Sequence, residues 1–305
     1  YSAFDYPTDL FPFTTVRHCD PRTDHCAGLA PDGVGELRIM QVNSGYEYWG
    51  RAAALIHVLP DGSDDVPPLP AERLYHVAGA QHFATPPGRW RRTAAGLAWQ
   101  DRGLVDPRDS LRALLQAMLD WVRDDRAPPA SRYPRLADGT LVPRPALRFP
   151  RLAGIAPPAR PHTPRRLHVG RRWQAGIIDR QPPLAGTPWP VLVPAVDALG
   201  NPRAGIRNTA VAAPLGTHLP WQLRADGRMR DFLGSFVPLQ PARTPVLPDS
   251  RPRLDVHWPS RAEYARRVDA VIAALVESRL LLPADAAAQR RRALALWQAL
   301  AEGGS

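Results

Sequence analysis

Two polar residues in the first third of the chain, Glu47 and His82, have the types and positions that acid–base chemistry requires. Each follows a strand-like apolar run, "ELRIMQVN" at 36–43 and "ERLYHVAGA" at 72–80, and they lie 35 residues apart (82 minus 47). A histidine can remove the proton of a hydroxyl nucleophile, and a carboxylate can fix the imidazole tautomer and stabilise the imidazolium. The pattern predicts Glu47 as the acid and His82 as the base of a nucleophile, acid and histidine triad.

Other interpretations of these residues stay open at this point. Glu47 could instead be a structural carboxylate that pairs with Arg51 one helical turn further on, and His82 could be a loop histidine without a role. Aromatic residues flank Glu47 on both sides. They are candidates for a substrate pocket, but aromatic side chains beside a strand end also commonly belong to the core; they are Tyr46, Tyr48 and Trp49.

The segment between the two apolar runs, "YWGRAAALIHVLPDG" at 48–62, predicts a short helix that ends at Pro60 and Gly62. Strand, helix and strand in this order are typical of a parallel sheet, in which polar residues gather at the carboxyl ends of the strands. His57 and His76 fall within these elements, and we expect them to be packing residues.

A second helix is predicted for "DPRDSLRALLQAMLDWVRDD" at 106–125, with Asp106 as the N-cap and Pro107 at the first helical position. Apolar residues recur at helical spacing and predict one face packed on a core: Leu111, Leu114, Leu115, Met118, Leu119 and Val122.

From residue 127 the chain is too rich in proline for long helices or central strands, and it is expected to wrap the surface. Residues 189–208 predict two short strands joined by a turn at 200–202, and two helices are predicted after Ser260. The predicted organisation is a core portion at 1–126 and a proline-rich extension with carboxyl-terminal helices at 127–305.

Two cysteines, Cys19 and Cys26, lie seven positions apart in "HCDPRTDHC". A disulfide between them would stabilise the fold by about 2.5 kcal/mol on a loop-entropy estimate and would suit a periplasmic or secreted protein. One alternative is a metal site that the two cysteines form with His18 and His25, although the spacing is not that of zinc modules. Another is a pair of free thiols, which a cytoplasmic protein could carry.

Composition suits a globular chain, because 305 residues with 44% hydrophobic residues can bury a sizeable core. The net charge of +10 comes from arginine without any lysine. These arginines are scattered rather than clustered, which argues against nucleic acid as a partner. No apolar run is long enough to predict a membrane span.

Several motifs resemble the alpha/beta hydrolase domain family. They cover nearly the whole chain: "YPTDLFPF" at 6–13, "NSGYEYWGRAAALIH" at 43–57, "YHVAGAQH" at 75–82, "APPASRYPRLADGTLV" at 127–142, "VPAVDALGNPRAGIR" at 193–207 and "VAAPLGTHLPWQLR" at 211–224. The resemblance implies an α/β fold in which this chain supplies the last two parallel strands of the sheet, that is, the carboxyl-terminal part. It also implies a serine hydrolase acting on an ester-like substrate, without a metal or organic cofactor.

The nucleophile expected of such an enzyme has no match here. A G-x-S-x-G elbow does not occur, Ser44 lacks the first glycine, and Ser235 lies far downstream of the acid and the histidine. We therefore expect the serine in an upstream segment or a partner chain, which the start at a residue other than Met would allow, and we expect the chain alone to be inactive. The rival expectation is a non-catalytic, hydrolase-like interaction module whose proline-rich wrap and basic surface bind a partner chain. A lone half-sheet would also expose an unpaired edge, so the isolated chain is expected to be poorly soluble or partnered.

Overall fold

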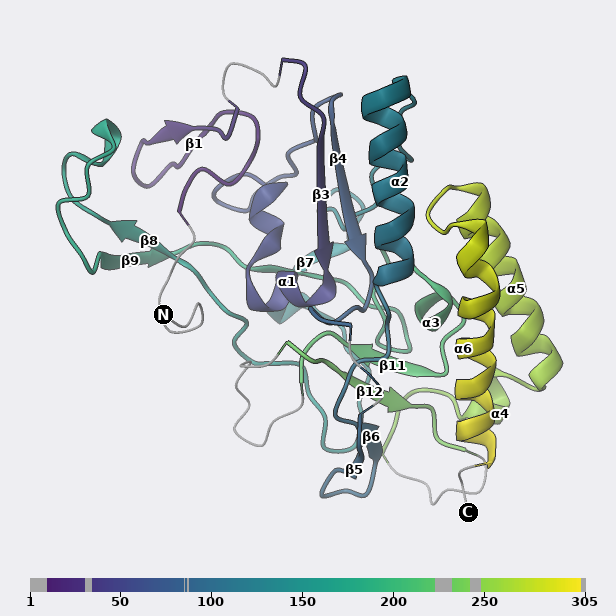
Figure 1. Ribbon diagram of the computed structural model, residues 1–305. Helices are drawn as coiled ribbons and strands as arrows, with labels where there is room; N and C mark the ends of the chain where they lie inside the picture. Colours follow the sequence, from purple (N-terminus) through teal and green to yellow (C-terminus); the bar gives the residue numbers. More distant parts are fainter. Residues whose placement is uncertain are drawn as a thin grey trace.

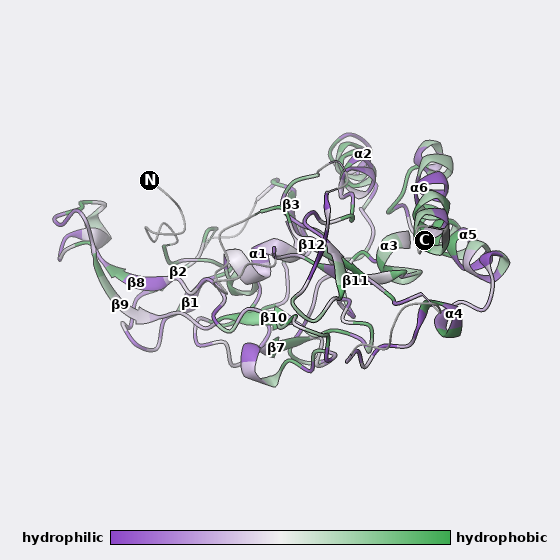
Figure 2. Cartoon of the chain, turned by 90° about the horizontal axis from the view of Figure 1, so that it is seen from below, coloured by the Kyte–Doolittle hydropathy of each residue, from purple (hydrophilic) through white to green (hydrophobic). Residues whose placement is uncertain are grey.

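The computed structural model describes residues 10–30, 35–84, 86, 88–222, 232–241 and 248–302, with the side chains of Gln174 and Glu302 excepted. Two neighbouring strands, β3 (Ile39–Ser44) and β4 (Glu72–Val77), stand at the centre (Figure 1). The helices to one side of them are α2 (Arg108–Asp124), α5 (Arg261–Glu277) and α6 (Pro283–Glu302). The β8–β9 hairpin projects as an arm at the opposite end. The view along the strands shows the same separation of helices and arm (Figure 2).

The predicted strand, helix and strand unit is confirmed. β3 (Ile39–Ser44) and β4 (Glu72–Val77) pair in parallel over their full lengths. The connection contains α1 (Gly45–Gly50) and a 3-10 turn, η1 (Ala53–Ile56). The helix starts earlier than predicted, because Ser44 and Glu47 form a capping box that begins it directly at the end of β3. It ends at Gly50 and not at the predicted Pro60, because Ala52 has a left-handed backbone with φ 50° that separates α1 from η1.

The two edges of this small parallel sheet differ. The outer edge of β4 is covered by the proline-rich extension: the His76 N–H donates to the Arg132 carbonyl at 2.8 Å, and the Ile206 N–H donates to the His76 carbonyl at 2.7 Å. Among the described residues, β3 pairs with β4 alone. Because the Ile39 N–H points to β4, the alternate N–H groups of Met40 and Val42 point to the open edge.

The helix α2 (Arg108–Asp124) forms as predicted, but the face assigned to it is wrong. Leu114 is buried at 2% exposure, whereas Leu111, Leu115 and Val122 are 42%, 62% and 63% exposed. The buried side is built instead from smaller residues and one tryptophan: Ser110, Ala113, Leu114, Ala117 and Trp121. Because several of the buried residues are small, a stripe defined by the largest apolar side chains does not mark the buried face of the helix.

Four further sheets are small and antiparallel, apart from isolated bridges. Their strands are β1 (His18–Cys19) with β2 (Cys26–Ala27), β7 (Leu141–Pro143) with β10 (Leu192–Pro194), β8 (Arg165–His168) with β9 (Leu184–Pro188), and, in spatial order, β11 (Gly216–Leu219), β12 (Ser235–Pro238), β6 (Ala98–Gln100) and β5 (Trp90–Arg92). The hairpin predicted at 189–208 forms in part. Its first strand is β10, but its second half makes only the bridges of Pro202 to Val196 and of Ile206 to Val77.

The remaining helical segments are η2 (Arg144–Ala146), η3 (Trp173–Ala175), α3 (Thr209–Ala212), α4 (Leu254–His257), α5 (Arg261–Glu277) and α6 (Pro283–Glu302). The two predicted carboxyl-terminal helices are confirmed, and the Ser260 hydroxyl caps α5 by accepting the Glu263 N–H at 3.1 Å. Their apolar faces share one core with Tyr75 and Leu114. None of the helices described here is long and apolar enough to cross a membrane.

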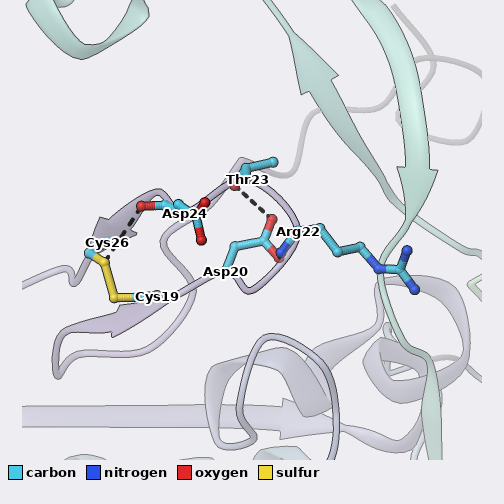
Figure 3. The surroundings of a disulfide bond; sticks show 6 residues. All are labelled: Cys19, Asp20, Arg22, Thr23, Asp24 and Cys26. Atoms are coloured by element: carbon cyan, nitrogen blue, oxygen red, sulfur yellow. Dashed lines mark hydrogen bonds between the residues drawn. A yellow bond between two sulfur atoms is a disulfide. The ribbon is translucent and has the colours of Figure 1, made fainter.

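The disulfide between Cys19 and Cys26 is confirmed and joins β1 to β2 (Figure 3). It engages both sulfur atoms, so the alternative metal site of two cysteines and two histidines does not form. In the loop that the bond closes, Asp20 is buried and makes a bidentate ion pair with Arg166 of β8, at 2.6 and 2.7 Å. The disulfide loop thereby anchors the base of the β8–β9 arm.

The correction to α2 can be tested by two matched substitutions, Leu114→Ala and Leu115→Ala. We expect Leu114→Ala to lower the free energy of unfolding by about 2 to 4 kcal/mol, because it opens a cavity in the core. Leu115→Ala should change it by less than about 0.5 kcal/mol, because that side chain is mostly in solvent. Urea unfolding measures both, and equal losses would contradict the assignment.

Candidate active site

The side chains of Glu47 and His82 are in direct contact. The Nδ1 atom of His82 meets Oε1 of Glu47, and Oε2 of the same carboxylate accepts the Ser44 N–H at 2.6 Å. The acid is therefore fixed at both oxygens, by the helix cap on one side and by the imidazole on the other.

Two connections after neighbouring parallel strands bring the pair together. Glu47 lies in the first turn of α1, directly after β3, and His82 lies in the loop after β4. The Tyr46 N–H donates to the Ala80 carbonyl at 3.2 Å, which ties the start of the helix to that loop. On the far side, the His82 N–H donates to the Phe232 carbonyl at 3.0 Å.

The protonation pattern of the imidazole follows from this contact. A carboxylate accepts hydrogen bonds, so Nδ1 carries the proton and Nε2 keeps its lone pair when the histidine is neutral. The His82 side chain is 40% exposed and that of Glu47 is 17% exposed. The arrangement can therefore accept a proton at Nε2 from a group that approaches from outside, while Glu47 stabilises the imidazolium.

Three aromatic rings surround His82. The ring centroids of Phe83, Phe232 and Tyr46 lie 4.4, 5.0 and 5.8 Å from the imidazole. Sequence reasoning named Tyr46 but missed the two phenylalanines. Phe83 adjoins the predicted histidine and could have been found on that ground, whereas Phe232 lies 150 residues away (232 minus 82) in no recognisable motif.

The other two aromatic candidates lie deeper. Tyr48 is buried, and its hydroxyl lies 2.9 Å from Nε2 of His57. Trp49 is also buried, and its ring lies 4.4 Å from that of Trp221. Of the three residues that flank Glu47, the structure brings Tyr46 against His82 and places Tyr48 and Trp49 in a core cluster.

Neither serine considered from the sequence has the setting of a nucleophile. Ser44 has an ordinary extended backbone, with φ −84° and ψ 175°, and its hydroxyl accepts the Tyr46 N–H at 3.2 Å as part of the helix cap. Ser235 lies in β12 and is fully buried. Arg51, the alternative partner of Glu47, donates its backbone N–H to the Glu47 carbonyl at 2.9 Å, while the carboxylate itself binds Ser44 and His82.

Three other histidines are buried. Burial lowers the pKa of His57 to about 4, of His76 to about 3 and of His218 to about 4, because each imidazolium would lose its hydration. These side chains are neutral in the folded protein near pH 7. The expectation that His57 and His76 are packing residues fits this placement.

In the described part of the chain, no group of three or more His, Cys, Asp or Glu side chains is arranged to hold a metal ion. A cavity of about 310 Å³ lies between the disulfide hairpin and the β8–β9 arm, where Asp20 and Arg166 contribute to its wall. Its lining contains neither Glu47 nor His82.

Comparison with known proteins gives one match. A family model described as an alpha/beta hydrolase domain matches residues 27–291, which include both Glu47 and His82. No curated protein and no solved structure matches the chain.

The buried histidines predict acid sensitivity. Their pKa values are lower in the folded protein than the ordinary 6.5, so the unfolded chain binds more protons below about pH 6.5. The stability they contribute is complete above that pH and falls as the pH drops towards 4, by up to about 1.4 kcal/mol per pH unit for each histidine. Urea unfolding between pH 7 and 4.5 measures the slope. His168→Gln, at an exposed position, should leave it unchanged, and a flat profile in the parent protein would contradict the prediction.

Proposed function

The chain belongs to the alpha/beta hydrolase domain family, and on that basis we propose that it acts in a serine hydrolase that cleaves an ester-like substrate. In this proposal Glu47 is the acid and His82 is the base. The observation that carries it is the contact between the Glu47 carboxylate and Nδ1 of a half-exposed imidazole, which leaves Nε2 free of the carboxylate.

The chemistry follows from this geometry. The serine hydroxyl gives its proton to Nε2 of His82 as its oxygen attacks the ester carbonyl carbon. The imidazolium, stabilised by Glu47, then protonates the leaving alcohol oxygen, and an acyl-enzyme remains. Water, deprotonated by the same Nε2 atom, attacks the acyl carbon, and the proton returns to the serine oxygen as the acid is released. This course needs no metal or organic cofactor.

The nucleophile, in our proposal, comes from a segment upstream of this chain or from a partner chain. Two observations support this. Ser44 is engaged in the helix cap and Ser235 is fully buried, so neither hydroxyl is presented to His82 in the described structure. In addition, among the described residues β3 pairs with β4 alone, so the N–H groups of Met40 and Val42 face an edge where further parallel strands of a hydrolase sheet could pair.

A second candidate function is a non-catalytic interaction module. The specific observation that favours it is the exposed apolar side of α2, with Leu111, Leu115 and Val122, together with the open edge of β3. Both features would serve partner binding without any chemistry. The two functions differ in whether the Glu47–His82 contact matters for turnover.

Substitutions in the complete, active protein test the assignment. His82→Gln should lower kcat by about 10³-fold or more, because no other described side chain takes the place of Nε2 at this site. Glu47→Gln is more informative than Glu47→Ala, because an amide oxygen can still cap α1 at the Ser44 N–H. It removes the charge that stabilises the imidazolium, so kcat should fall by about 10² to 10⁴-fold with little change in thermal stability.

The matched control is His168→Gln, which changes an exposed histidine of β8 in the same way. It should leave kcat within twofold of the parent value. If His82→Gln keeps parental activity while its circular dichroism is unchanged, His82 is not the base, and the interaction module becomes the better account.

A further inference from the structure

The surroundings of His82 form a cluster of four rings that is open to solvent on one side. Besides their contacts with the imidazole, Phe232 lies 5.4 Å from Phe83 and 5.1 Å from Tyr46, measured between ring centroids. Tyr46 is buried beneath the group, whereas Phe83 is 50% exposed. An apolar ring that is half in solvent beside a reactive imidazole offers a surface that a ligand could cover.

The backbone holds these rings in place. The carbonyls of Phe232 and Leu233 accept the N–H groups of His82 at 3.0 Å and Gly103 at 2.7 Å. Gly234 follows with φ +65°, and a Cβ atom there would lie 2.8 Å from the Leu219 carbonyl oxygen. A larger residue would therefore disturb this approach, so the backbone at Phe232 has a defined position next to His82.

The role of His82 decides which part of an ester would touch these rings. The imidazolium must pass its proton from Nε2 to the leaving oxygen, so that oxygen has to come within hydrogen-bond distance of the imidazole. The alcohol portion of the substrate is bonded to this oxygen, whereas the acyl portion is bonded to the carbonyl carbon, one bond further away. A ring that packs against the imidazole therefore faces the alcohol portion.

We propose that Phe83, supported by Phe232, forms the subsite for the alcohol portion of the substrate, and that this subsite takes an aryl-bearing alcohol such as a benzyl group. The proposal rests on the proposed function, because it requires His82 to be the base. The plane of the Phe83 ring makes an angle of 72° with the plane of the imidazole and an angle of 60° with the plane of the Phe232 ring. A further aromatic ring can add to such a group of tilted rings.

The test compares three esters in the complete protein: benzyl acetate, ethyl acetate and ethyl phenylacetate. Phe83→Ala should lower kcat/KM for benzyl acetate by about tenfold, the size expected for losing one well-packed aromatic contact in the transition state. It should leave kcat/KM for ethyl acetate within about twofold. Phe83→Tyr keeps the ring and should retain the preference for benzyl acetate.

Benzyl acetate and ethyl acetate form the same acetyl-enzyme, from which the alcohol portion has already left. Because Phe83 is proposed to contact only the alcohol portion, the rate of hydrolysis of this acetyl-enzyme should be the same in Phe83→Ala as in the parent protein. Trp90→Ala is the matched control. It removes an aromatic side chain of nearly equal exposure, 49%, from β5, and it should change no ester by more than about twofold.

Two results would overturn the subsite while leaving the proposed function intact. An equal loss of kcat/KM for all three esters in Phe83→Ala would make Phe83 a positioning residue for His82. A loss confined to ethyl phenylacetate would place the ring on the acyl side. If the parent protein hydrolyses none of the esters, or if His82→Gln is as active as the parent, the proposed function fails and the subsite fails with it.

Discussion

The arrangement of this site depends on one carboxylate that makes two contacts. Glu47 closes the amino-terminal end of α1 through the Ser44 N–H, and it binds Nδ1 of His82 with its other oxygen. The first contact limits the rotation of the acid, and the second fixes the imidazole tautomer, so that Nε2 keeps its lone pair when the histidine is neutral. A parallel pair of strands makes this possible, because the carboxyl ends of β3 and β4 bring the two connections to the same edge of the sheet.

The proline-rich extension was expected to wrap the surface, but it supplies buried residues to a core cluster, among them Leu141, Leu152 and Val193. It also contributes to this site. It covers the outer edge of β4 through Arg132 and Ile206, and it returns at Phe232 to hold the backbone of His82. The disulfide loop and the Asp20–Arg166 ion pair belong to the opposite end, where they anchor the β8–β9 arm. Burial disfavours the charged form of Asp20 and by itself would raise the pKa of this carboxyl. The hydrogen bonds that Asp20 accepts from Arg166, the Arg22 N–H and Thr23 outweigh this effect, so its pKa lies below the ordinary value.

Local sequence signals predicted the parallel unit, the carboxyl-terminal helices, the disulfide and the two residues that meet at the site, because each depends on short-range pattern or strand order. The face of α2 was predicted wrongly, since the buried residues include Ala113, Ala117 and Trp121, whereas Leu111, Leu115 and Val122 are exposed. Capping by Ser44 had a readable signal, Ser and Glu three positions apart, that was overlooked. Phe232 had none, because its contact with His82 arises from long-range chain folding.

The most direct measurement is the site of covalent labelling by a fluorophosphonate in the complete, active protein, mapped by peptide mass spectrometry in the parent and in His82→Gln. The account predicts one labelled serine that lies outside residues 1–305, in an upstream segment or a partner chain, and it predicts that the rate of labelling falls sharply in His82→Gln. Labelling of Ser44 or Ser235, or labelling at an unchanged rate without His82, would contradict the proposal that this chain supplies the acid and the base to a nucleophile held elsewhere.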